Sequence, residues 1–201
     1  MALTPTTVHE IAEQLLGCVC AALDDVAAVN PQLAGCPTCR TCVVPGTPAW
    51  DSCGECCGGG GEVGGQLTVG VARMWSSTRE TFPAEDRTVR DSRGCRLPVT
   101  AVELVVTLLR CVPGPDDRGD PPPCEDLAAA ARQLHADGFT VMQAILCCVP
   151  GTSQVRNGRR FVMGQQRVLG PEGYCGGVEQ RVTVELPGCD PCGLVGVGSA
   201  G

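Results

Sequence analysis

Residues 97–111 read LPVTAVELVVTLLRC, and this stretch decides the fold. It is rich in β-branched residues, which favour strands. Alternate residues of a strand point to opposite faces, so Val105 falls on one face and Leu104 on the other. A strand that is apolar on both faces is covered on both. The stretch therefore predicts the central strand of a sheet.

The segments on either side of this strand predict a sheet with two helices. Residues 66–75 and 178–186 alternate apolar and polar side chains, as half-buried strands do. Residues 4–27 and 125–148 instead repeat apolar residues every three or four positions, which is the pattern of an amphipathic helix. We therefore expect an α+β fold, with a mainly antiparallel sheet, two helices packed on one face, and long loops rich in Pro, Gly and Cys.

The chain has 201 residues, which suits one domain with a core better than two. Residues 36–65 are rich in Cys and end in runs of Gly, so we expect a long loop inside that domain. The last segment, residues 188–201, is expected to form a flexible tail. The sequence thus predicts one α+β domain over residues 1–187, followed by the tail.

A hairpin with several arginines is expected near the C-terminal end of the domain. Asn157-Gly158 suits a type I′ turn, which needs positive φ at both central positions. The segment GPEGYCGG, residues 170–177, is expected to turn before the last strand. A solvated strand face and a contact with an acidic neighbouring subunit explain the arginines equally well. The interface candidates are Arg156, Arg159, Arg160 and Arg167.

Sixteen cysteines raise the question of metal or disulfides, and six of them lie in CPTCRTCVVPGTPAWDSCGECC, residues 36–57. Two C-x-x-C pairs thirteen residues apart have the spacing of a structural zinc site. Its ligands would be Cys36, Cys39, Cys53 and Cys56. Two further cysteines would be left over, and the glycines and the basic or aromatic surroundings of a zinc ribbon are missing. Disulfides within a long loop, or unpaired thiols, are therefore the interpretation we prefer, and no other cofactor is expected.

Composition argues against several functions. The net charge is −7, so there is no basic field to hold a nucleic acid. A cysteine enzyme needs a histidine base, and His9 and His135 both fall on exposed helix positions, so we do not expect an enzyme. No apolar run is long enough to cross a bilayer, and the first residues do not read as a secretion signal. We expect synthesis in a cytoplasm and no membrane partner.

Four segments, taken in order, resemble a family of small proteins encoded among the head-to-tail connector and tail genes of long-tailed, non-contractile phages of actinobacteria. They are CRTCVVPGTPAWDSC, GQLTVGVARMWSSTRETFP, VELVVTLLRCVPGPDDRGDPPPCEDLAAAA and VLGPEGYCGGVEQRVTVEL. Since the cysteine-rich stretch belongs to this pattern, the resemblance implies that its cysteines staple a long loop.

The resemblance implies a tail terminator, which forms a ring, commonly a hexamer, on the last ring of the tail tube. Its partners would be other copies of itself, the tail tube protein and the head-side connector or stopper protein, with DNA passing through the channel. The protein would be assembled in the host cytoplasm and end in the neck of the virion. Two alternatives are a head-completion or stopper protein of the same neck and a zinc-binding adaptor.

Overall fold

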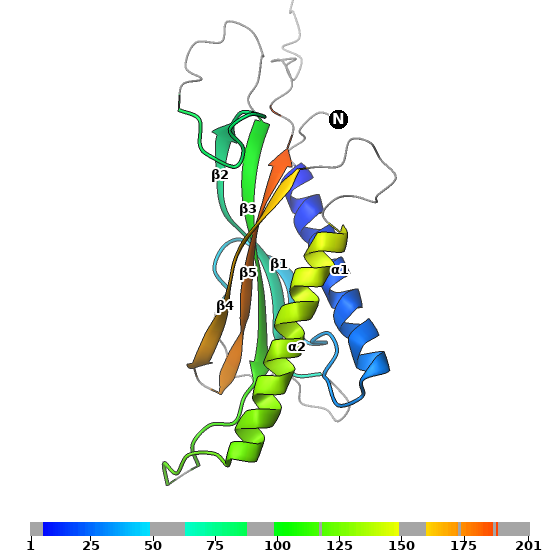
Figure 1. The fold of residues 1–201 in the computed structure, drawn as a ribbon, viewed down its shortest axis with the longest axis vertical. Coiled ribbons are helices and arrows are strands. Elements are labelled where there is room, and N and C mark those ends of the chain that lie inside the picture. The colour runs from blue at the N-terminus through cyan, green and yellow to red at the C-terminus, as the bar shows by residue number, and fades with distance from the viewer. Residues whose placement is uncertain are drawn as a thin grey trace, which may run out of the picture.

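The computed structural model describes residues 6–48, 63–87, 99–116, 118–148, 160–172, 174–186 and 188. It confirms the expected α+β class: two helices pack against each other and against a five-stranded, mostly antiparallel sheet (Figure 1). The elements are α1 (Thr7–Val29), β1 (Thr41–Val44), β2 (Gln66–Ser77), β3 (Val99–Cys111), α2 (Cys124–Cys148), β4 (Phe161–Glu172) and β5 (Cys175–Leu186).

The sheet has the strand order β1-β2-β3-β5-β4, so β3 lies at its centre, as the sequence predicts. Only the pairing of β1 with β2 is parallel. In the antiparallel pairs, Leu108 of β3 lies opposite Leu67 of β2 and Val178 of β5. A Cβ at Gly177 of β5 would overlap the carbonyl oxygen of Leu108, so the close approach of β3 and β5 requires glycine there.

The main core lies between the helices and one face of the sheet. Alternate residues of β3 point into it, starting at Val102, while their neighbours point to the opposite face. The helices contribute residues at three- and four-residue steps, as the sequence predicts. The fully apolar centre of this core includes Leu15, Val19, Leu23, Leu67, Val69, Leu104, Val106, Leu108, Val141, Ile145 and Val182.

A buried ion pair joins the central strand to α2. Arg110 Nε donates to Asp137 Oδ2 at 2.9 Å, and its Nη2 donates to Oδ1 at 3.0 Å. The side chains are only 4% and 2% exposed. Arg110 also donates to the carbonyl of Ala34, and Gln133 donates to Asp137. The pair therefore ties β3 and α2 to the segment that follows α1.

Two disulfides fasten α1 to other parts of the chain, and they differ from the expected staples within the Cys-rich loop. Cys18–Cys148 joins the two helices and is called the interhelix disulfide here. Cys20–Cys36 joins α1 to the segment behind it. Cys39 and Cys175 are disulfide-bonded as well.

The disulfide of Cys36 bears on the zinc hypothesis. A zinc ligand must be a thiolate, and the sulfur of Cys36 is bonded to that of Cys20 in this form of the chain. Cys39 is also oxidised. Cys53 and Cys56 lie outside the described residues. In this structure two of the four candidate ligands are therefore not thiolates, and a zinc site at these residues stays a prediction for the reduced chain.

Two strand assignments differ from the sequence expectation. The four residues of β1 lie in the segment expected to be a loop, and they pair in parallel with β2. β4 continues to Glu172 and β5 begins at Cys175, so strands take up most of the segment 170–177 that was expected to turn. Tyr174, directly before β5, takes a φ of 63°. The hairpin expected at Asn157-Gly158 lies outside the described residues.

Candidate interaction surface on the outer face of the sheet

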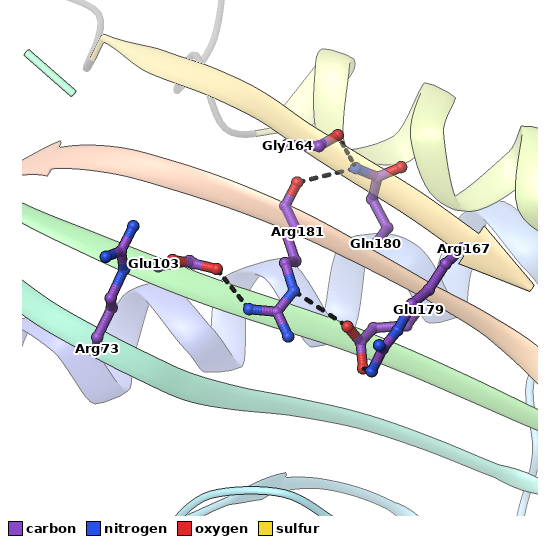
Figure 2. Close-up of polar contacts among 7 residues, drawn as sticks. All are labelled: Arg73, Glu103, Gly164, Arg167, Glu179, Gln180 and Arg181. Carbon is purple, nitrogen blue, oxygen red and sulfur yellow. Dashed lines mark hydrogen bonds and ion pairs between the residues drawn. The ribbon is translucent and has the colours of Figure 1, made fainter. Parts of the chain in front are cut away.

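The face of the sheet turned away from α1 and α2, called the outer face here, carries a row of charged residues across four strands (Figure 2). Their alternation with the core residues of β3 and β5 places Glu103, Glu179 and Arg181 on this face. The row, called the arginine row here, consists of Arg73 of β2, Glu103 of β3, Arg181 and Glu179 of β5, and Arg167 of β4.

Each glutamate of the arginine row bridges two arginines. Glu103 accepts from Arg73 Nε at 2.7 Å through Oε2 and from Arg181 Nη1 at 2.7 Å through Oε1. Glu179 accepts from Arg181 Nε at 3.1 Å and from Arg167 Nη2 at 2.9 Å. The ion pairs thus form one connected chain from β2 to β4, which fixes the side-chain positions better than isolated surface pairs do.

Two β-bulges bring the outer arginines of the row to this face. In β2, the core residues Leu67, Val69 and Val71 alternate regularly, and continued alternation would point Arg73 into the core. The register shifts between Val71 and Arg73, and Arg73 instead lies opposite Glu103. An extra residue in one strand reverses which side chains point outward.

The second bulge does the same for Arg167 in β4. Met163 packs on the core, and the register shifts between Met163 and Gln166, so Arg167 lies opposite Glu179 on the outer face. Gln180 holds this bulge, because its Nε2 donates to the carbonyls of Gly164 at 2.9 Å and Arg181 at 2.8 Å (Figure 2).

The guanidinium groups form the outermost layer of the arginine row. Its arginine side chains are between 40% and 67% exposed, whereas those of Glu103 and Glu179 are 10% exposed. An arginine has five N–H donors, and Arg73 and Arg167 each use one within the row. The guanidinium of Arg73 also lies over the ring of Trp75, 4.2 Å from its centroid. Exposed guanidinium groups of this kind can bind a carboxylate or a phosphate.

The ionisation of the row follows from these contacts. Burial by itself would raise the pKa of Glu103, but hydrogen bonds from Arg181 and Arg73 outweigh it, and the pKa of this carboxyl is lowered. The hydrogen bond to Glu103 raises the pKa of Arg181, against the opposing effect of burial and with further support from Glu179. Both shifts favour the charged form of the Glu103–Arg181 pair.

A second charged group lies at the end of β5. Glu185 is within 3.9 Å of Arg79 and 3.5 Å of Arg160, and it is mostly covered while both arginines are exposed. Arg160 also stacks over the ring of Phe82 and donates to the carbonyl of Arg79. With the arginine row, these residues give the outer face five arginines against three glutamates, in a chain whose net charge is −7.

The structure places two of the four expected interface arginines on this face. Arg160 belongs to the second group and Arg167 to the arginine row, while Arg156 and Arg159 lie outside the described residues. Sequence reasoning missed Arg73, Arg79 and Arg181. The sequence offered a signal for Arg73, a charged residue at a position where the alternation of Leu67, Val69 and Val71 requires an apolar one.

Comparison with known proteins adds no family to this description: no protein-family model matches the chain, and no curated protein sequence is significantly similar to it. Among the described residues, no three His, Cys, Asp or Glu side chains are grouped to hold a metal ion. None of the described helices is long and apolar enough to span a bilayer.

Proposed function

We propose that this chain is a structural protein of the phage head-tail junction, a tail terminator. Copies of it would form a ring, a hexamer by the family resemblance, on the last ring of the tail tube. The ring would stop growth of the tube and present a surface to the head-side connector, and DNA would pass through its channel.

The ordered set of four sequence segments carries this proposal, because of where the segments fall in the fold. They contain β1, β2, β5 and all but the first three residues of β3, which are four neighbouring strands of the sheet. They also contain all of the arginine row except Arg167, which directly precedes the last segment. The resemblance therefore covers most of the sheet and of its charged face, and a ring protein works through such extended surfaces.

The charge distribution is compatible with this role. A terminator needs one surface for its neighbours in the ring and others for the tube and the connector. The outer face has fixed, paired charges with free donors, which suits recognition of a protein surface more than chemistry on a substrate.

The test is to polymerise the tail tube protein of the same phage with and without this chain. A terminator shortens the tubes and leaves a cap at one end, and capped tubes do not elongate when more tube protein is added. Tubes that grow to the same length with the chain present would refute the proposal. Binding to the head-side connector without any effect on tube growth would favour the stopper role instead.

A further inference from the structure

The helix layer carries the opposite charge from the outer face. In α1, Glu10, Glu13, Asp24 and Asp25 are all exposed, and the helix contains no lysine or arginine. In α2, the exposed charged residues are Glu125, Asp126 and Arg132. The solvent side of the helix layer therefore has six acidic residues against one arginine.

These two charged surfaces lie on opposite sides of the molecule, because both helices cover one face of the sheet and the arginine row lies on the other (Figures 1 and 2). A second copy of this chain thus offers, on its helix layer, the carboxylates that the guanidinium groups of the outer face can bind. Two copies joined through like faces would instead bring charges of the same sign together, which is unfavourable.

We propose that copies of this chain associate head to tail, with the helix layer of one copy on the outer face of the next. This proposal rests on the ring-forming role proposed above and names the surfaces that build the ring. A contact between two different surfaces repeats from copy to copy, and it closes into a ring when the rotation between copies allows. The paired surfaces at each contact are thus acidic and basic.

Apolar side chains on both surfaces add to the contact. Phe139 and Leu146 are exposed one above the other on α2, seven residues apart. On the outer face, Val162 of β4 is exposed opposite Thr183. Burial of these side chains would add apolar area from each side to the contact.

Two charge variants separate the two surfaces. The helix variant carries Glu13→Arg, Asp25→Arg and Asp126→Arg, and it leaves Asp24 intact because that side chain binds the backbone of Cys36. The sheet variant carries Arg73→Gln, Arg79→Gln and Arg167→Gln, and it keeps Arg181 to hold both buried glutamates. Asp120→Arg, in the exposed loop before α2, is the matched control for an added positive charge.

Native mass spectrometry of each variant, and of the two mixed, provides the test. We expect each charge variant alone to weaken self-association at least about tenfold, and the control to change it less than about twofold. Mixing must give a 1:1 heterodimer and nothing larger, because only one functional helix layer and one functional outer face remain to meet. The unfolding midpoints of all variants verify that they are folded.

Several results would overturn the head-to-tail contact: a wild-type chain that stays monomeric, variants that assemble like the wild type, or a mixture that stays monomeric. A monomer that binds a short DNA duplex through Arg73 and Arg167 would assign the outer face to nucleic acid instead. Head-to-tail rings or filaments that do not cap tail tubes would keep this contact and refute the terminator. If each charge variant caps tail tubes as the wild type does, the terminator role stands and the head-to-tail contact is refuted.

Discussion

Replacing Asp137 with alanine should be among the most destabilising single changes in the described part of the chain. The substitution removes the carboxylate that accepts two hydrogen bonds from Arg110 and one from Gln133. The guanidinium of Arg110 is 4% exposed, so it cannot recover these bonds from water. Its Nη1 already lacks a partner among the described residues, and only the carbonyl of Ala34 would remain.

The expected cost is about 3–5 kcal/mol, because breaking one side of a buried ion pair leaves an uncompensated buried charge. That is a large part of the about 5–15 kcal/mol that stabilises a typical domain. Urea unfolding of the unreduced protein, followed by circular dichroism, measures the loss. The matched control is Glu85→Ala, which breaks an exposed pair with Arg87 and should cost less than about 0.5 kcal/mol.

A double variant separates the buried charge from the lost packing. Arg110→Met with Asp137→Leu removes both charges and fills similar volumes, so it should be more stable than Asp137→Ala alone. A loss below about 1 kcal/mol for Asp137→Ala would refute the reasoning. A double variant as unstable as the single one would show that the charge is not the cause.

Three further predictions concern stability. The pKa of Glu103 is lowered on folding, so its carboxylate stabilises the native state above the unfolded pKa of about 4.3, and this contribution disappears as pH falls through the lower folded value. In urea unfolding, the difference in unfolding free energy between wild type and Glu103→Gln should therefore shrink at acid pH. A difference that stays constant with pH would contradict this. A disulfide that closes a longer loop restricts the unfolded chain more. Removing the interhelix disulfide, which spans 130 residues, should therefore cost about 5 kcal/mol, against about 3 kcal/mol for Cys20–Cys36, which spans 16. The reverse order of unfolding free energies in serine variants would contradict this dependence on loop length. Gly177→Ala should destabilise the sheet, because its Cβ would overlap a backbone carbonyl. Gly17→Ala, in open space on α1, should instead raise the free energy of unfolding by about 1 kcal/mol, because alanine favours a helix more than glycine does. Thermal unfolding compares the two variants, and equal effects would refute the steric argument.

The elements with regular periodicity could be predicted from the sequence. The central position of β3 followed from apolar residues on both its faces, and both helices followed from their three- and four-residue repeats. β1 could not be recognised, because its four residues take their strand conformation from parallel pairing with β2. Three of these four residues are β-branched, but a run of four is too short to identify a strand within a segment rich in Cys, Pro and Gly.

The disulfides and the charged face were harder to predict for physical reasons. Cysteine spacing does not determine connectivity, and the partner of Cys18 is 130 residues away. The arginine row depends on two register shifts, and one extra residue in a strand reverses every side chain after it. Of the five arginines described on the outer face, only Arg160 and Arg167 were singled out from the sequence, through their closeness to an expected hairpin.

A native mass spectrum of the purified, unreduced protein tests the central claim most directly, because it reports the number of subunits, any bound metal and the disulfides together. The proposed ring predicts a closed assembly of identical subunits without metal, which dissociates as ionic strength rises because charge pairs form its contacts. A symmetric dimer as the largest species, or a monomer with or without zinc, would contradict it.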